Sequence, residues 1–343
     1  MEKAVYIVIG CDTDPDRDYF VSDIPTGSLS WRGMLEGIPR AKEQLHGLTD
    51  SDGKPPAFTW LIRADHQIRQ IHGAYDYILQ NHTDFLLELE KSGDELGWHP
   101  HFWRCMKDGK TWYQEHKDHQ WQVEMLREAH AAYQATLPGR PRTVRMGWAY
   151  HNNRTLATLD ELGIEVEISA LPGLKIRPGK GSASMSNYYD WSITPSRPYY
   201  PSRADYRREP KDSEGSYALL EAPNTVAGSF VWGLVSGVAL ARKMKDIRQL
   251  GYALSKPAFI STITSKPVLF KPMLRQVKKD LARRDSVFYV TPLHPDELID
   301  NMHPVYSLEH MKANLGAILE LAEHVGAKTR YITGSEIKDH FRA

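Results

Sequence analysis

Short apolar segments alternate with longer amphipathic segments along most of the chain, and this alternation is what most constrains the fold. Apolar segments rich in β-branched residues predict buried strands, whereas apolar residues at steps of three and four predict helices. The predicted strands are residues 5–11, 57–63, 96–101, 144–148, 164–169, 219–222, 287–291 and 330–333, and the predicted helices are residues 83–91, 115–136, 153–162 and 307–325. This order predicts an α/β fold with about seven parallel strands, in which a distorted (β/α) barrel is favoured over an open sheet.

The 343 residues are predicted to form one catalytic domain with two unusual segments. Residues 172–223 are rich in Gly, Ser, Pro and Tyr and interrupt the alternation. Their many aromatic residues favour an ordered loop that shapes a pocket. Residues 256–284 are basic and predict an amphipathic helix. That helix could contact a membrane surface or a phosphate-bearing substrate, or it could simply present a solvated face.

Charge and cysteine content exclude several classes of protein. Lys plus Arg and Asp plus Glu both number 43, so a basic nucleic-acid binder is not expected. The two cysteines exclude a disulfide scaffold and a cysteine-rich zinc module. Apolar runs are too short for a membrane span, and the first strand begins almost at once, so a cytoplasmic location is expected. The sequence does not predict an oligomeric state.

Polar residues gather where the predicted strands end. His99 and His101 stand two residues apart in an extended segment, and this spacing places both imidazoles on one face. Asp12 and Asp14 repeat the spacing after the first strand. In a barrel, these strand ends meet at one rim. The pattern predicts a metal centre of two histidines and one carboxylate with a spare carboxylate beside it, which is suited to activating water.

Each of these residues also has a simpler interpretation. The two aspartates could cap a helix and form a turn beside Pro15. Arg145, after the fourth strand, could form an ordinary ion pair. Asp65, after the second strand, could bind substrate or cap a helix. His294 directly follows a predicted strand and is favoured as a functional histidine over His303, which also precedes a proline.

Taken in order, these motifs resemble the NodB-homology polysaccharide deacetylases, a family similar to carbohydrate esterase family 4. The motifs are Asp12-Thr13-Asp14, His99-Pro100-His101, Arg145-Met146-Gly147-Trp148, Asp190-Trp191 and Leu293-His294-Pro295. The resemblance extends from Asp12 to about Glu336 and marks a divergent member. Thr13 separates aspartates that are usually adjacent, one residue instead of three separates the histidines, and Arg-Met-Gly-Trp replaces the usual Arg-x-Pro-Tyr.

The resemblance implies a role for each site residue. Asp14, His99 and His101 would hold one divalent metal, for which zinc is expected and cobalt, nickel or iron also fit. Asp12 would be the general base, Arg145 would keep it ionised, and His294 would be the general acid. Asp65 and four tryptophans near the motifs are the candidate substrate contacts, although most aromatic residues pack in cores: Trp98, Trp103, Trp148 and Trp191.

The implied activity is removal of an N-acyl group, acetyl or formyl, from an amino sugar. The expected cytoplasmic location favours a sugar nucleotide or a glycan intermediate of surface-polysaccharide or lipopolysaccharide biosynthesis as the substrate. Two alternatives remain open. The same scaffold could hydrolyse another carbon–nitrogen bond, as in a cyclic imide or ureide, or the protein could bind glycans without catalysis.

Overall fold

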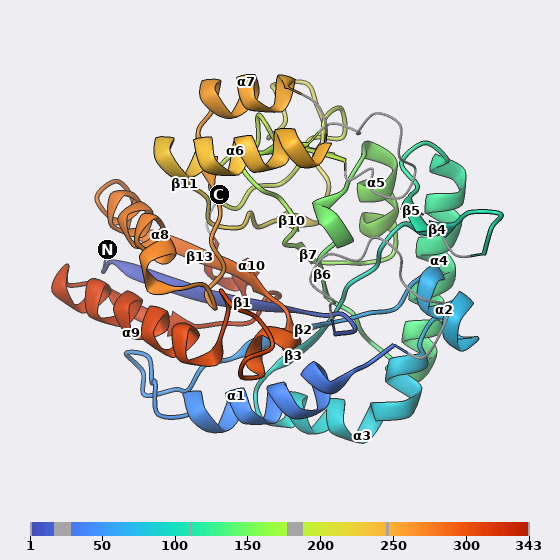
Figure 1. The fold of residues 1–343 in the computed structure, drawn as a ribbon, viewed down its shortest axis with the longest axis horizontal. Coiled ribbons are helices and arrows are strands. Elements are labelled where there is room, and N and C mark those ends of the chain that lie inside the picture. Colours follow the sequence, from blue (N-terminus) through green and yellow to red (C-terminus); the bar gives the residue numbers. More distant parts are fainter. Residues whose placement is uncertain (1, 17–28, 110–111, 177–187, 245–246, 342–343) are drawn as a thin grey trace.

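The computed structural model describes residues 2–16, 29–109, 112–176, 188–244 and 247–341. Its central sheet is entirely parallel, in the order β10-β7-β6-β3-β2-β1-β13, with β14 beside the first half of β1 (Figure 1). The strands are β1 (Ala4–Thr13), β2 (Phe58–Ile62), β3 (Glu95–Trp98), β6 (Thr143–Val144), β7 (Val166–Glu167), β10 (Leu220–Glu221), β13 (Ser286–Leu293) and β14 (Lys328–Tyr331). The predicted α/β class and the parallel, barrel-like sheet are confirmed.

Helices surround this sheet in Figure 1. They are η1 (Gly33–Gly37), α1 (Ile38–Leu45), α2 (His66–His72), α3 (Tyr77–Lys91), α4 (His119–Thr136), α5 (Asn153–Glu161), α6 (Phe230–Met244), α7 (Arg248–Ser255), α8 (Pro267–Leu281), η4 (Pro295–Leu298), α9 (Leu308–His324) and α10 (Ile337–His340). Local sequence sets several of their ends. Asn152 and Thr155 form a capping box at the start of α5, and Ser307 caps α9. None of the described helices is long and apolar enough to cross a membrane.

Several elements differ in length from the sequence-based expectation. The predicted strand 144–148 stops at Val144, and a 3₁₀ turn, η2 (Gly147–Ala149), follows. Trp148 has a φ of 59° in that turn, which an extended strand cannot adopt. The long helix begins at His119 rather than 115, because the Asp118 side chain caps it by accepting from the Trp121 N–H. Before it, β5 (Trp112–Gln114) pairs with β4 (Trp103–Cys105).

Strand β1 is buried on both faces. Val5, Ile7 and Ile9 join the large core between sheet and helices, whereas Tyr6 and Val8 join a second core with side chains from β7, β10 and β13. Alternate residues of a strand face opposite sides, so Gly10 and Asp12 continue the face of Tyr6 and Val8. The periodicity thus points Asp12 toward the interior of the curled sheet, at its carboxyl edge.

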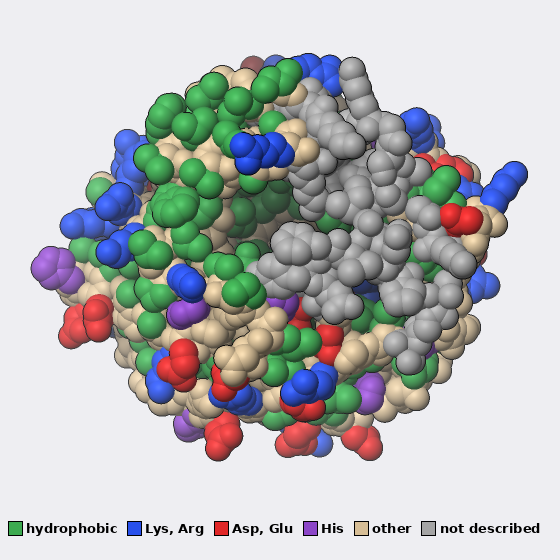
Figure 2. All heavy atoms as spheres, in the orientation of Figure 1, with side chains coloured by type: hydrophobic (Ala, Val, Ile, Leu, Met, Phe, Trp, Pro, Cys, Tyr) green, Lys and Arg blue, Asp and Glu red, His purple; other side chains and the backbone are tan. Residues whose placement is uncertain are grey.

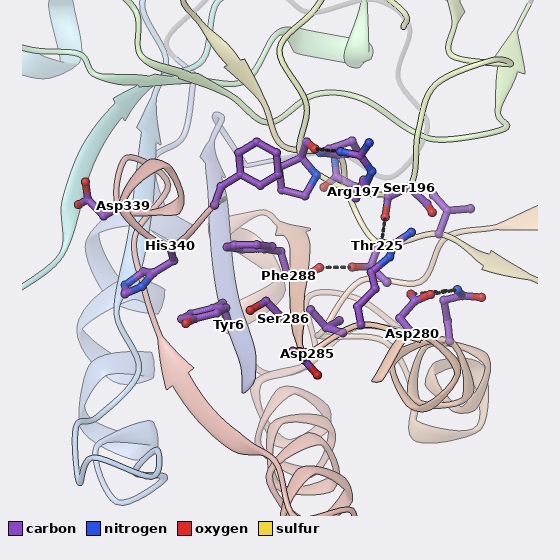
Figure 3. Close-up of a pocket in the computed structure, with 18 of the residues that line it drawn as sticks. Tyr6, Ser196, Arg197, Thr225, Asp280, Asp285, Ser286, Phe288, Asp339 and His340 are labelled. Atoms are coloured by element: carbon purple, nitrogen blue, oxygen red, sulfur yellow. Dashed lines mark hydrogen bonds between the residues drawn. The ribbon is translucent and has the colours of Figure 1, made fainter. Parts of the chain in front are cut away.

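The sheet does not pair across the seam between β10 and β13. Thr225 bridges them: its backbone N–H donates to the carbonyl of Val290, and its hydroxyl accepts from the Val290 N–H. A pocket of about 700 Å³ opens along this seam (Figure 3). Tyr6 and Phe288 stack in its wall with ring centroids 5.0 Å apart. The pocket borders the amino-terminal halves of β1 and β13, and the predicted site residues do not line it.

The described parts of segment 172–223 are folded against the body. Strands β8 (Lys175–Ile176) and β9 (Tyr189–Asp190) form a small hairpin, and Trp191 and Tyr199 are fully buried. Residues 177–187 of this segment lie outside the described residues. A further antiparallel pair joins β11 (Ala227–Gly228), which precedes α6, to β12 (Ala258–Phe259), which follows α7.

Candidate metal centre

Six predicted site residues follow one another around the carboxyl edge of the sheet. Each lies in the last part of a strand or just beyond it, and the strands concerned are β1, β3, β6 and β13: Asp12, Asp14, His99, His101, Arg145 and His294. One correction concerns the histidines. They lie beyond the end of β3 at Trp98, in residues that belong to no strand, so strand alternation does not explain their convergence.

Asp14, His99 and His101 bring one possible ligand atom each to within 4.8 Å of one another. The Nε2 atoms of the two histidines are 2.9 Å apart, and their rings are nearly perpendicular. The carboxylate of Asp14 lies 3.7 Å from Nε2 of His99 and 3.6 Å from Nε2 of His101. Two nitrogens and a carboxylate oxygen around one point form the donor set of a catalytic zinc site.

The surroundings fix the tautomer of His99. Its Nδ1 lies 2.7 Å from the carbonyl oxygen of Arg145, and a carbonyl can only accept, so Nδ1 carries the proton. Burial would lower the pKa of His99, but the Asp12 and Asp14 carboxylates outweigh it and raise that pKa. In the neutral ring, Nε2 keeps a lone pair directed at His101. A proton on His101 could satisfy this pair as a hydrogen bond, but a cation would satisfy both nitrogens and the carboxylate. These residues fit a divalent metal, with the Arg145 carbonyl as the outer partner that orients a ligand.

Burial keeps the second imidazole neutral. It lowers the pKa of His101 to about 4, and the nearby Arg63 guanidinium acts in the same direction. A neutral imidazole is the form that binds metal. Gly147 makes room for this ring, because a Cβ at that position would lie 2.1 Å from Cγ of His101. The position of the His101 ring therefore requires glycine at residue 147.

Each aspartate has its own arginine. Burial would raise the pKa of Asp14, but Arg63 and the two histidines outweigh it and hold the pKa well below its usual range. Burial likewise opposes ionisation of Asp12, whereas Arg145 and His99 lower its pKa. Both carboxylates are therefore ionised at neutral pH inside a buried site.

Arg145 is fixed by four acceptors. Its guanidinium donates to the Asp12 carboxylate at 3.0 Å, to the carbonyls of Gly10 and Ile168, and to the side-chain oxygen of Asn224. Gly10 is required here, because a Cβ would lie 2.9 Å from an Arg145 nitrogen. Arg145 is buried, so the alternative interpretation as an ordinary surface ion pair is excluded.

His294 closes the site from β13. Its Nε2 lies 4.0 Å from Asp12 and 3.7 Å from Asp14, and its Nδ1 lies 3.4 Å from the buried carboxylate of Glu297. The side chain is 23% exposed, more than any of the aspartates or histidines around it. His303, the competing candidate, pairs instead with Asp296 and is buried.

Asp65 supports the site without facing its opening. One carboxylate oxygen caps α2 by accepting from the backbone N–H groups of Gln67 and Ile68. The other accepts from the backbone N–H of His101 and from Arg63. Asp65 is fully buried, so we reassign it from a substrate contact to a helix cap that positions the His101 backbone.

The four tryptophans divide into two groups. Trp98 and Trp191 are fully buried, and their indole N–H groups donate to the carbonyls of Ala64 and Ala149. These two are corrected from substrate contacts to core packing. Trp103 lies nearly parallel to the His101 ring at 6.1 Å, and Trp148 meets Trp103 edge to face. Trp103 is buried, whereas Trp148 is half-buried, so Trp148 remains the candidate substrate contact of the four.

Four supporting residues were not anticipated from the sequence. Arg63 bridges Asp14 and Asp65, Asn224 accepts from Arg145, Gly147 accommodates His101, and Glu297 faces His294. A signal existed for Arg63, since a charged residue at the end of an apolar strand beside Asp65 needs a buried partner. Asn224 lies in an irregular segment, and the sequence pattern does not indicate it.

No family model matches the chain, and no curated protein matches its sequence. Solved structures do match. A protein from Parabacteroides distasonis, provisionally described as a glycoside hydrolase/deacetylase, superposes with a TM-score of 0.58 at 14% identity, over 98% of this chain and 71% of that one. A protein from Mycobacterium smegmatis, provisionally described as a polysaccharide deacetylase, gives a TM-score of 0.48 at 15% identity, over 99% and 90%.

The chain shares the fold of the Parabacteroides distasonis protein. The first superposition carries this conclusion, because it covers nearly the whole chain with a TM-score above 0.5. A GH57 branching enzyme from Thermococcus kodakaraensis gives a TM-score of 0.44 at 10% identity, over 100% of this chain and 72% of that one. At these identities the likeness concerns the fold alone, and chemistry must be argued from the site.

Proposed function

We propose that this protein is a metal-dependent hydrolase that removes an N-acyl group, acetyl or formyl, from an amino sugar. One observation carries the proposal. The donor atoms of Asp14, His99 and His101 surround one point, and Asp12 and His294 stand beside it from β1 and β13. A ligand set flanked by two different proton carriers is the arrangement that amide hydrolysis requires.

A divalent metal held by Asp14, His99 and His101 would polarise the amide carbonyl and lower the pKa of a bound water. Asp12 and His294 would accept and donate the protons. Asp12 is ionised and fixed by Arg145, so it can accept a proton from the attacking water. Its buried position keeps competing solvent away from that oxygen.

His294 is the proton donor to the leaving amine. An amine leaves poorly unless it is protonated, so a second proton carrier must face the bond that breaks. His294 is the most exposed of the site imidazoles, and its Nδ1 lies 3.4 Å from the Glu297 carboxylate, which can orient the ring. In this proposal Glu297 is a positioning residue, since it acts through His294.

An amino sugar is favoured by the aromatic surface next to the ligands. The half-buried Trp148 ring, which Trp103 supports edge to face, provides an apolar face of the kind that stacks on sugar rings. We include in the proposal a substrate linked to a nucleotide or to a growing glycan of surface-polysaccharide biosynthesis. Zinc is the metal we expect, and loading with cobalt, nickel or iron provides the comparison.

The test measures free amine and released carboxylic acid from a panel of N-acetyl and N-formyl amino sugars, as monosaccharides, sugar nucleotides and oligomers. Metal content of the same preparations is measured in parallel. We expect stoichiometric metal, turnover of at least one substrate class, and loss of turnover after chelation with recovery on reloading. Turnover of cyclic imides or ureides alone would overturn the proposal. Glycan binding by protein that holds no metal would favour the non-catalytic alternative.

A further inference from the structure

The α6–α7 region exposes large apolar side chains to an unusual degree. Nine large hydrophobic side chains of the described residues are exposed, and six of them lie between residues 230 and 268. They come from α6, the start of α7, the end of α7 and the start of α8: Phe230, Val231, Val235, Ile247, Leu254 and Val268. We call this set the apolar surface. Figure 2 shows it as a cluster of hydrophobic side chains over α6, α7 and α8, at the upper left.

Helix α6 exposes large apolar side chains, whereas glycines form the face that packs on the rest of the protein. Its inner face carries Gly233 and Gly237, where a Cβ would lie 3.0 Å from Pro257 and 2.3 Å from the Cβ of Ala253. Close approach to α7 therefore requires glycine. Val231 and Val235, which are 65% and 53% exposed, lie on the opposite side of the helix from the two glycines, and Phe230, at the first position of α6, is 60% exposed. A water-facing helix normally places charged residues there.

Basic residues accompany this surface. Between residues 229 and 271 the sequence contains seven Lys or Arg and a single Asp. Arg242, Lys266 and Lys271 are exposed, and Figure 2 shows Lys and Arg side chains around and within the apolar cluster. Apolar side chains bordered by positive charge match the chemistry of an anionic lipid surface, whose acyl boundary and headgroups accept the two kinds of group.

We infer that the apolar surface is a peripheral membrane-binding site that takes an anionic phospholipid surface. The charge excess decides between this occupant and a second copy of the chain, because the same basic surface would face itself across a two-fold interface. The inference does not depend on the chemistry at the metal centre, since none of the surface residues contributes to that site.

The test is co-sedimentation of the full chain with phosphatidylcholine vesicles, with and without about 30% phosphatidylglycerol. We expect binding that requires the anionic lipid and weakens as salt concentration rises. The variant F230S/V231S/V235S should lose about tenfold or more of the partition coefficient, because three apolar side chains no longer insert. The matched control L35S/M106S removes exposed apolar side chains elsewhere and should bind as the wild type does.

A charge variant gives an independent readout. R242E/K271E should abolish the preference for anionic vesicles while the apolar side chains remain. Wild-type protein that binds neither vesicle, or a triple variant that binds as well as wild type, would overturn the inference. Analytical ultracentrifugation distinguishes the other occupant: a concentration-dependent dimer that the triple variant abolishes would assign the surface to a second copy.

Discussion

Two regions of the molecule reverse the ordinary distribution of polar and apolar groups, in opposite directions. At the candidate metal centre, charged side chains are buried: Asp12, Arg63 and Arg145 all lie inside. At the apolar surface, Phe230 and Val231 face solvent. Neither arrangement stabilises the fold. Buried charges lose their hydration, and exposed apolar side chains contribute no hydrophobic stabilisation. Such local departures from a consistent fold are expected at functional sites.

The two regions differ in how the free-energy cost of the buried charges or of the exposed apolar side chains is offset. Within the metal centre, each buried charge has a partner of opposite sign, as in Asp12 with Arg145 and Asp14 with Arg63. Within the described residues, no other part of the chain covers the apolar surface. We therefore expect an external partner to cover it. Substitutions should therefore have large effects on chemistry in the first region and small effects on folding in the second.

The largest effect is expected for His101→Ala. It removes one of three ligand atoms, so the protein should lose its metal and its turnover together. Metal content measured on the purified variant, alongside turnover, checks this. His130→Ala is the matched control, because His130 is also buried but packs against Trp98 on the helix side. Full metal content in His101→Ala would contradict the ligand assignment.

Asp12→Asn should lower kcat about 100- to 10,000-fold while metal content stays at the wild-type level. The amide keeps the shape of the carboxylate and can still accept from Arg145, but it cannot take a proton from water. Turnover and metal content measured on one preparation separate the two effects. Loss of metal from this variant would mean that the ligand and base assignments of Asp12 and Asp14 are exchanged.

The two arginines should separate binding from chemistry. Arg63→Gln removes the partner of Asp14 and should weaken metal affinity about 10- to 100-fold, as loss of an outer-shell contact does. Arg145→Gln removes the main group that lowers the pKa of Asp12. That pKa then rises, and because the base works ionised, the acidic limb of the kcat/KM profile should move to higher pH. Metal titrations and pH profiles of both variants measure this, and identical behaviour of the two would contradict the division of roles.

Much of the metal centre could be predicted because it depends on topology. All strands of the sheet are parallel, so residues at their carboxyl ends meet wherever the exact strand boundaries fall. That is why Asp14, His99 and His101 converge although the histidines lie beyond the strand that was expected to hold them. The sequence indicated a buried partner for Arg63 but not that this partner would be Asp14, at the end of the neighbouring strand β1. Asn224 could not be assigned, because it lies in an irregular segment.

The tryptophans and the apolar surface show where sequence reasoning stopped. Proximity to a motif in the chain does not indicate which way a side chain points, and Trp98 and Trp191 point into the core. In α6 the apolar residues surround the helix, so periodicity alone does not identify its outer face. Gly233 and Gly237 mark the inner face, and they acquire that meaning only once α7 is seen to pack there.

Between pH 4 and 6.5 the stability of metal-free protein should follow His101, because the raised pKa of His99 changes stability only above that window. The pKa of His101 is about 4 in the folded state and about 6.5 when unfolded. Between these values the unfolded chain binds more protons, so stability falls as pH is lowered from 6.5 to 4. Thermal unfolding of chelator-treated protein should show this fall, and His101→Asn should make it shallower. An unchanged slope in the variant would contradict a neutral, buried His101.

The smallest effect is expected at the apolar surface, where two valines offer a matched pair. Val231 is 65% exposed on α6, whereas Val8 is fully buried in β1. Val231→Ala should change the free energy of unfolding by less than about 0.5 kcal/mol, because little area leaves or enters water. Val8→Ala should cost about 2 kcal/mol, since it removes two methyl groups from a packed core. Denaturant unfolding of both variants measures the difference. A cost at Val231 as large as that at Val8 would mean that this side chain is covered in solution, and it would favour a second copy of the chain over a lipid surface.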